Sequence, residues 1–243
     1  MKNLPKNLLT IYGRNTVLEA LLDNKLKIYA LHLSKSNKAS EKLDKIINLA
    51  KKRDIEIKYH DKDKLSRISK NKKQDQGVAL DIILDNFIEL DALVSKDSFK
   101  ILALDGIENP QNLGLIIRSA AAGDIDAIIV PKKGSASLVS PLTIKASVGT
   151  IFKIPIIQSP NLLQSLKELA INGASIITLD SNAKYDIKAL KVPKKSVFVL
   201  GNESRGVSKE IDSISNYRVK ISMNRGVESL NVAVTASLIS LCL

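Results

Sequence analysis

Short apolar runs alternate with helical segments throughout residues 98–243, and this alternation constrains the fold more than any other feature of the sequence. Runs rich in Ile, Val and Leu predict strands, and apolar residues spaced three and four apart predict helices. Strands separated by helices indicate an α/β fold with a mainly parallel sheet and helices packed on its faces. The predicted strands are 101–104, 127–130, 153–157, 175–179, 197–200 and 218–221, and the predicted helices are 113–122, 162–172 and 230–241.

A second, smaller α/β pattern precedes this one. Helices are expected at 15–22 and 43–50 and strands at 28–33, 55–59 and 78–84, with a charged stretch at 61–75 before the last strand. The pattern weakens after residue 84. We therefore divide the chain into a first part (1–84), a linker (85–97) and a second part (98–243).

The positive charge of the chain is concentrated in the first part. The whole sequence carries a net charge of +12, yet residues 1–80 hold 19 Lys and Arg against 9 Asp and Glu, a net +10. Residues 81–243 hold the other 18 against 16, a net +2. A basic segment attracts polyanions by releasing their counterions, so the asymmetry favours nucleic-acid binding. A basic face that is merely solvated is the alternative.

The scarcity of cysteine and histidine excludes several kinds of site. Cys242 is the only cysteine, so an internal disulfide and a thiolate metal cluster are excluded. His32 and His60 are the only histidines, too few for a His/Cys zinc site and an argument against a Ser-His-Asp hydrolase. We expect no metal. No apolar run approaches the roughly 20 residues that cross a bilayer, and the start lacks a signal-peptide pattern. A soluble protein in a reducing, cytoplasmic setting, with no membrane partner, is predicted.

Three polar loops that contain glycine follow predicted strands of the second part, where parallel sheets usually bind ligands. The first, residues 105–118, leads into a helix. Asn112 suits the N-cap of that helix, and the amides there suit an anion such as an RNA phosphate. Taken alone, Asn112 is equally well a plain cap and Arg118 a surface residue.

The other two loops occupy residues 200–207 and 221–231. Glycines in the second loop allow close approach of the backbone to a flat ligand, and Glu203 could hold a ribose hydroxyl or a neighbouring arginine. An ordinary turn with an exposed carboxylate is the alternative. In the third loop, Ser229 and Asn231 stand at the entry of the terminal helix, where capping is the default explanation.

The order and spacing of these loops resemble the SpoU (TrmH-like) branch of the SPOUT methyltransferases. The resemblance is carried by the following residues: Asn112, Gly114 and Arg118; Gly201, Asn202, Glu203 and Gly206; and Ser229, Leu230, Asn231 and Val232. Residues 146–155 also resemble the segment between motifs, so that the resemblance covers residues 98–243. Asn109 stands where the family usually has Asp, and Ser204 where Gly is commoner, but neither is a motif residue.

The first part resembles the substrate-binding domain of bacterial ribosomal-RNA guanosine 2′-O-methyltransferases, at residues 11–21 and 76–78. In those relatives this small α/β domain is similar to ribosomal proteins that bind RNA. Here Arg14 and Asn15 stand where a histidine often occurs. The resemblance thus implies that the first part binds RNA, in agreement with the charge.

The same resemblance implies a fold, an activity and a cofactor. The parallel sheet of the second part would be threaded into a trefoil knot, and the chain would transfer a methyl group from S-adenosylmethionine to a ribose 2′-hydroxyl. A guanosine of large-subunit ribosomal RNA is the implied substrate. Residues expected to bind the cofactor are Gly201, Ile221, Met223 and Leu230, together with Thr178 and Leu179 at a strand end.

Arg118 is the residue that we expect to perform chemistry. The family's proposed role for it is the base that takes the ribose proton. Because a guanidinium hardly loses its proton, stabilisation of the developing 2′-oxyanion is the alternative. Asn112, Glu203, Ser229 and Asn231 would orient Arg118, the ribose and the cofactor.

Relatives work as dimers that join through the knot and the terminal helix, so a homodimer is implied here. Small and apolar residues of the helix 230–241 suit such packing, although they could equally face the chain's own sheet. Transfer-RNA methylation, and a relative that binds RNA without catalysis, remain alternatives. A nucleotide-dependent oxidoreductase is disfavoured, because no G-x-G-x-x-G turn follows a strand.

Overall fold

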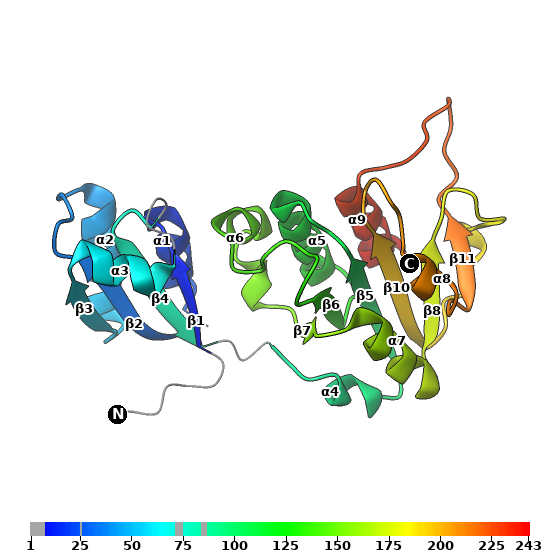
Figure 1. Cartoon of the computed structure of the whole chain (residues 1–243), viewed down its shortest axis with the longest axis horizontal. Coiled ribbons are helices and arrows are strands. Elements are labelled where there is room, and N and C mark those ends of the chain that lie inside the picture. The colour runs from blue at the N-terminus through cyan, green and yellow to red at the C-terminus, as the bar shows by residue number, and fades with distance from the viewer. Residues whose placement is uncertain (1–7, 25, 71–74, 84–86) are drawn as a thin grey trace.

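The computed structural model describes residues 8–24, 26–70, 75–83 and 87–243, and it contains two sheets that lie side by side (Figure 1). The first sheet has four strands in the order β1-β4-β2-β3; β2 and β3 are parallel and the other pairs antiparallel. Its elements run β1 (Leu8–Tyr12), α1 (Arg14–Leu22), β2 (Lys27–Ser34), α2 (Glu41–Lys52), β3 (Glu56–His60), α3 (Lys62–Ser69) and β4 (Val78–Ile83).

Helices α1 and α2 cover one face of this sheet, and their apolar residues form its core. Ile46 of α2 and Leu31 and Leu80 of the strands are fully buried there. The guanidinium of Arg53, which follows α2, donates to the carbonyls of Leu21, Asp23 and Leu26, at 2.9, 3.1 and 2.6 Å. Arg53 therefore fixes the end of α1 to the end of α2.

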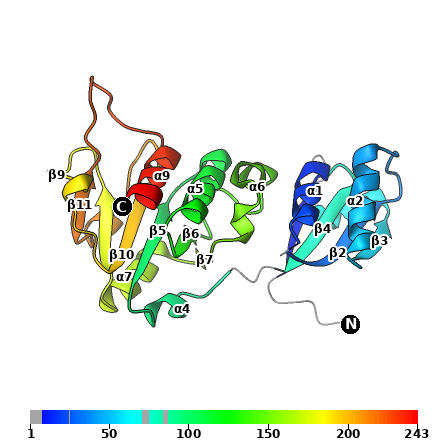
Figure 2. The same ribbon diagram turned by 180° about the vertical axis from the view of Figure 1, so that it is seen from behind.

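The second sheet has seven strands, all parallel, in the order β7-β6-β5-β10-β8-β11-β9 (Figure 2). Its elements run α4 (Asp91–Val94), β5 (Phe99–Asp105), α5 (Pro110–Ala122), β6 (Ala127–Pro131), α6 (Pro141–Ser147), η1 (Thr150–Phe152), β7 (Ile156–Ser159), α7 (Leu162–Ile171), β8 (Ser175–Leu179), β9 (Tyr185–Asp186), η2 (Ile187–Ala189), β10 (Lys195–Gly201), α8 (Lys209–Asp212), β11 (Tyr217–Lys220) and α9 (Val232–Cys242).

Alternating residues of the strands build two cores. On β5, Leu102 and Leu104 face the core beneath α5, α6 and α9, whereas Ile101 and Ala103 face the core beneath α4, α7 and α8. Both faces of the parallel sheet are therefore covered, which is why its strands are almost continuously apolar. The predicted fold class is confirmed: a mixed α/β chain with a large parallel sheet.

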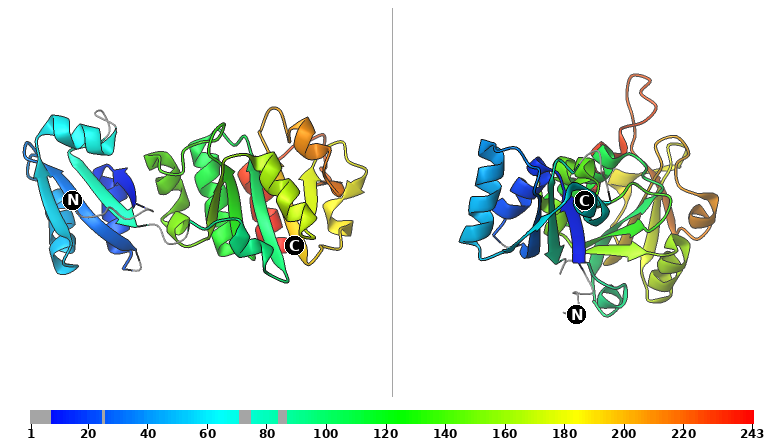
Figure 3. Two further views of the ribbon diagram at one scale, coloured as in Figure 1. Left: turned by 60° about the horizontal axis from the view of Figure 1, so that its bottom comes forward. Right: turned by 60° about the vertical axis from the view of Figure 1, so that its left-hand side comes forward.

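The last segment of the chain returns across the sheet. After β11, residues 222–231 stand out above the strands and then lead into α9, which packs against α5 over the middle of the sheet (Figure 3). The close approach of the two helices requires Gly123, because a Cβ there would lie 2.1 Å from the carbonyl oxygen of Ser240. Asn231 at the start of α9 bonds to Asn112 of α5, whereas the trefoil knot itself stays a prediction.

Several predicted elements differ from those observed. The strand predicted at 153–157 was wrong in its first residues, because Pro155 has no N–H and the segment before it forms η1; β7 begins at Ile156. The helix predicted at 230–241 begins at Val232, since Asn231 is its N-cap. Strands β1 and β9 and helices α3, α4, α6 and α8 were not predicted. Ser140, whose side chain accepts from the Thr143 amide, followed by Pro141 was a signal for α6.

The segment between the two sheets is partly attached to the second one. Phe87 forms a bridge with Ile156 beside β7, and Leu93 of α4 is buried in the second core. Leu84, the predicted end of the last strand and of the first part, lies outside the described residues, as do residues 85 and 86 of the predicted linker.

Candidate functional site

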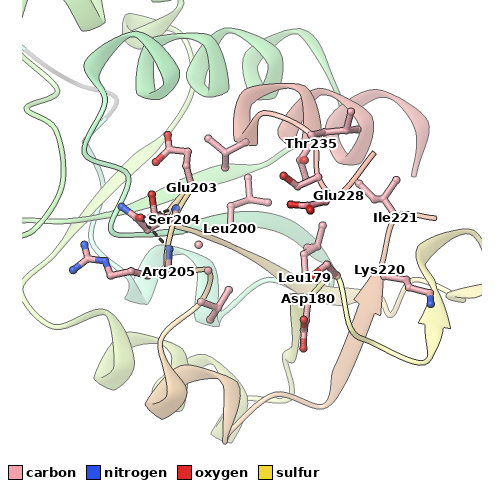
Figure 4. Close-up of a pocket in the computed structure, with 18 of the residues that line it drawn as sticks. Leu179, Asp180, Leu200, Glu203, Ser204, Arg205, Lys220, Ile221, Glu228 and Thr235 are labelled. Carbon is pink, nitrogen blue, oxygen red and sulfur yellow. Dashed lines mark hydrogen bonds between the residues drawn. The ribbon is translucent and has the colours of Figure 1, made fainter. Parts of the chain in front are cut away.

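A cavity of about 770 Å³ opens beyond the carboxyl ends of β8, β10 and β11 (Figure 4). The segments that enclose it follow β8 and β10 or run from β11 into α9, as expected of a parallel sheet, whereas the predicted loop 105–118 does not line it. The predicted site residues that line it are Leu179, Gly201, Glu203, Ile221, Met223, Ser229, Leu230 and Asn231. The structure thus brings together residues that are separated by up to 52 positions in the sequence.

The loop after β10 closes on itself at the first wall of the cavity. The amide of Asn202 donates to the carbonyl of Gly206 at 3.1 Å, and the reverse bond measures 2.9 Å. A Cβ on Gly201 would lie 2.1 Å from the carbonyl carbon of Gly206, so that only glycine permits this closure. The Asn202 side chain donates to the carbonyl of Gly106 at 2.8 Å. This bond ties the loop to the one that follows β5.

A hydrogen-bonded row of side chains joins all three loops. Asn112 Nδ2 donates to Glu203 Oε1 at 2.5 Å, and Asn231 Nδ2 donates to Asn112 Oδ1 at 3.2 Å. Asn112 therefore uses both ends of its amide, one toward each of the other loops. Glu203 holds this asparagine, and not an arginine, in the described structure.

The prediction that Asn112 caps α5 was wrong. Asn109 is the N-cap, and its Oδ1 accepts from the amides of Gln111 and Asn112 at 2.8 and 3.3 Å. Pro110 occupies the first helical position, where a missing N–H costs nothing. Because capping falls to Asn109, the Asn112 side chain is available for the row of hydrogen bonds. Asn109 also shows that the departure from the family's usual Asp keeps an oxygen acceptor at this point.

Asn231 makes two kinds of bond at the start of α9. Its Oδ1 accepts from the amide of Ala233 at 2.8 Å, which caps the helix, while its Nδ2 reaches Asn112. Ser229 makes no cap bond, and it lies exposed in the wall of the cavity. Capping thus explains the bond of Asn231 Oδ1 but not the bond of its Nδ2, and it does not explain the position of Ser229 in the cavity wall.

Three of the predicted residues do not line the cavity. Asn112 reaches it only through its bonds to Glu203 and Asn231, and Thr178 and Arg118 lie away from it. The side chain of Thr178 is buried in the sheet, and its hydroxyl donates to Asp212 Oδ1 at 3.0 Å. Arg118 is exposed on α5, nearly two turns beyond Asn112, and it is absent from the cavity wall. Gly114 serves the packing of α5 on α6, because a Cβ there would lie 2.5 Å from the Thr143 carbonyl oxygen.

Other residues of the site were missed by the sequence argument. Asp180 and Glu228 place carboxylates in the wall, and Thr235 of α9 adds a hydroxyl (Figure 4). Arg205 donates to Glu108 Oε1 at 2.6 Å, a second link between the loops after β5 and β10. The position of Asp180 directly after a strand was a usable signal, whereas Glu228 and Arg205 had none.

Within the described ranges, no group of His, Cys, Asp or Glu side chains is arranged to hold a metal ion. Across the same part of the chain, no helix combines the length and the apolar character that crossing a membrane needs.

Comparisons with known proteins agree with this geometry. Residues 100–241 match the SpoU rRNA Methylase family, and residues 10–86 match the family described as RNA 2′-O ribose methyltransferase substrate binding. A protein of Bacillus subtilis (strain 168) named as a TrmH family tRNA/rRNA methyltransferase, YacO, is 31% identical over 234 residues, covering 94% of this chain and 92% of the relative. One from Staphylococcus aureus (strain COL) with the same family name is 31% identical over 237 residues, covering 94% and 92%.

Solved structures show the same fold. The SpoU methyltransferase AviRb from Streptomyces viridochromogenes superposes with a TM-score of 0.70 at 20% identity, covering 96% of this chain and 87% of that one. The AdoMet-bound rRNA methyltransferase from Sinorhizobium meliloti gives a TM-score of 0.67 at 21% identity, covering 96% and 85%. At such identities the likeness bears on the fold alone.

Proposed function

Because the chain belongs to the SpoU/TrmH family of RNA methyltransferases, we propose that it methylates a ribose 2′-hydroxyl of RNA with S-adenosylmethionine as the methyl donor. The substrate proposed is a guanosine of large-subunit ribosomal RNA. The match of residues 10–86 to a substrate-binding family of 2′-O ribose methyltransferases supports the reaction type, and the resemblance of the first part supports the substrate.

The row Glu203–Asn112–Asn231 is the observation that carries this proposal. Three loops that are far apart in the sequence converge at one edge of the sheet, and this row of side chains joins them there. A bare structural role would be served by backbone bonds or apolar contacts. Exposed amide and carboxylate groups fixed beside a cavity are instead suited to binding a polar ligand.

The cavity fits the proposed methyl donor. Leu179, Ile221 and Leu230 offer apolar surface to a flat adenine, and the closed loop at Gly201 presents backbone groups at the edge of that surface. The carboxylate of Glu228 suits the positive charges of an amine and a sulfonium. When bound, S-adenosylmethionine supplies a methyl group that is already reactive, so that the protein's main contribution is alignment.

Arg118 is the residue that we propose for the ribose oxygen. A guanidinium that donates to the developing 2′-oxyanion would stabilise it in a site from which water is excluded. The alternative, that Arg118 takes the proton, would require a strongly lowered pKa and would give a titrating limb in the pH–rate profile. Asn112 and Glu203 would orient the ribose beside it.

We further propose that a second copy of the chain supplies this arginine. Arg118 is exposed on α5, and this helix and its neighbour α9 carry exposed apolar residues, among them Leu115, Val234 and Leu238. An apolar patch of this kind on neighbouring helices suits a symmetric dimer. Within one chain Arg118 lies outside the cavity wall, and a dimer would place it at the cavity of the other copy.

Mixing two variants of lowered activity tests the shared site. In a hybrid of Arg118→Ala and Asn231→Ala chains, one cavity has an intact wall and receives Arg118 from the other copy. Methyl transfer should therefore rise on mixing above the mean of the two separate variants. If each chain used its own Arg118, both cavities of the hybrid would be defective and mixing would restore nothing. Sedimentation at micromolar concentration should show a dimer in either variant.

The first measurement is transfer of tritiated methyl groups onto total RNA from cells that lack the protein, followed by mapping of alkali-resistant sites. One labelled guanosine in large-subunit RNA is the expected result. Label in transfer RNA would keep the chemistry and overturn the substrate. Absence of label on RNA and on ribosomal precursors, despite binding of S-adenosylmethionine, would overturn the enzymatic proposal.

A further inference from the structure

A second cavity adjoins the first along the outer edge of the seven-stranded sheet. Its volume is about 740 Å³, and β9, β11 and the segments that flank β9 enclose it. Asp180 and Asn182 line both cavities, so that the two share a wall. Nothing in the proposed methyl transfer uses this second cavity.

Two exposed tyrosines stand in its wall. Tyr185 of β9 is 71% exposed and Tyr217 of β11 is 43% exposed. Val219 pairs with Tyr185 in the parallel ladder, and Tyr217 precedes Val219 by two residues, so the two rings belong to the same face of the sheet. The chain contains only five tyrosines and four phenylalanines, and such exposure of two rings in one cavity leaves their surfaces available to a ligand.

The charged groups around the rings favour an anionic ligand. Lys184 and Lys191 line the cavity, and neither forms an ion pair with any described part of the chain. The two carboxylates of the wall are turned to backbone amides: Asp180 accepts from Asn182 at 2.9 Å, and Asp186 accepts from Lys188 and Ser222 at 2.8 and 3.0 Å. The lysines are therefore the groups left to meet a ligand.

We propose that this cavity binds an unpaired base of the RNA substrate, stacked on Tyr185 and Tyr217, with its phosphate beside Lys184 and Lys191. Base stacking on aromatic rings next to cations is the usual way in which proteins hold single-stranded RNA. Because the wall is shared with the first cavity, this base is a close neighbour of the nucleotide that receives the methyl group. The inference rests on the proposed function, and it adds that the enzyme requires an unpaired nucleotide beside its target.

Binding of full-length variants to two RNA probes tests the stacking. One probe is a labelled oligoadenosine of about 12 nucleotides, a length typical of single-strand sites, and the other has the same backbone without bases. Replacement of both tyrosines by Ala should weaken binding to oligoadenosine about tenfold or more, since stacking contributes about 1–3 kcal/mol per base. Binding to the abasic probe should not change, because it has nothing to stack.

Matched variants show whether the rings themselves matter. Tyr185→Phe and Tyr217→Phe keep an aromatic surface and should bind oligoadenosine as the wild type does. Ile171→Ala, at a residue that is 86% exposed at the end of α7, is a control for loss of an exposed apolar side chain. Since the chain has no tryptophan, quenching of tyrosine emission by oligoadenosine is a second readout, which should persist in Ile171→Ala and vanish whenever both tyrosines are replaced, by Ala or by Phe.

Three results would overturn the inference. They are unchanged affinity of the double Ala variant for oligoadenosine, an equal loss on both probes, and a tenfold loss of affinity for S-adenosylmethionine, which would assign the cavity to the methyl donor. Transfer of tritiated methyl groups by the wild-type chain distinguishes this failure from failure of the proposed function. If that transfer occurs and the tyrosine variants bind normally, only the stacking site is refuted.

Discussion

Replacing Asn231 separates its structural role from its proposed catalytic one. Asn231→Asp keeps an oxygen that can accept from the Ala233 amide, and a negative charge at a helix N-terminus is favourable. The same change removes the Nδ2 donor and places an acceptor against Asn112 Oδ1, 3.2 Å away in the wild type. To avoid two facing acceptors, the Asn112 amide must turn, and it then gives up its bond to Glu203.

The sizes of the two effects follow from these contacts. A hydrogen bond to a charged group contributes about 1.5–3 kcal/mol, and exposure of the pair places the Asn112–Glu203 bond at the lower end, about 1.5 kcal/mol. A loss of that size lowers kcat/KM about tenfold. Asn231→Ala removes the cap as well, at about 1 kcal/mol, which lowers Tm by about 2–4 °C in a chain of this length.

The assay compares kcat/KM for methyl transfer with Tm in the two variants. In Asn231→Asp the turned Asn112 amide donates to the new carboxylate at position 231 in place of Glu203, so the number of hydrogen bonds is kept while Glu203 loses its partner. We therefore expect Asn231→Asp to lose activity at nearly wild-type Tm, and Asn231→Ala to lose both. Wild-type kcat/KM in Asn231→Asp would refute the reasoning, because the row of side chains would then have no role beyond capping. A parallel loss of activity and Tm in Asn231→Asp would refute it as well, since the defect would be one of folding.

Three further predictions concern other parts of the molecule. Arg118→Ala should lower kcat by about a hundredfold, as loss of an oxyanion donor does, while Tm and the Kd for S-adenosylmethionine stay at wild-type values; a matching rise in Kd would place Arg118 in the cofactor cavity instead. Burial, the nearby His32 and two lysines lower the pKa of His60 from 6.5. Burial raises the pKa of Asp81, but hydrogen bonds from His32 and Thr10 outweigh burial and keep the pKa of Asp81 below 3.8. Both groups bind protons more readily when unfolded, so the free energy of unfolding should fall as the pH drops below 6.5 and again below 3.8, and urea midpoints of His60→Gln should lack the first fall. Gly123→Ala should lower Tm by about 4–8 °C, because the overpacking against Ser240 costs about 2 kcal/mol; an unchanged Tm in calorimetry would show that α9 moves aside freely.

The strands of the second sheet could be predicted because both of its faces are covered. Each buried strand is a nearly continuous apolar run, as β10 and β6 are, and such runs stand out in a sequence. The strand predicted at 153–157 begins three residues before β7, because the prediction used the apolar pattern and did not consider the backbone restrictions that Pro155 imposes. Helix α6 is short, and the N-cap residue Ser140 is the sequence feature that indicates it.

The site was predictable as a set of loops and not as a set of contacts. Each loop follows a strand, and parallel strands end at a common edge, so convergence of the loops could be expected from the pattern. The contact between Asn112 and Asn231, 119 residues later, depends on the return of α9 over α5. The helical periodicity predicts that α9 is a helix, but it does not predict against which element the helix packs. The same holds for Arg118, whose distance from the cavity follows from the side of α5 on which it stands.

The course of α9 also determines the order in which the first sheet and the cavity are completed during synthesis. The first sheet is complete when residue 83 has left the ribosome, whereas the cavity lacks a wall until residues 228–232 have been made. Domains generally fold in the order of their synthesis. From then until residues 228–232 have been made, therefore, the nascent chain displays a folded basic unit that can attract RNA, and the methyl-transfer cavity is completed later.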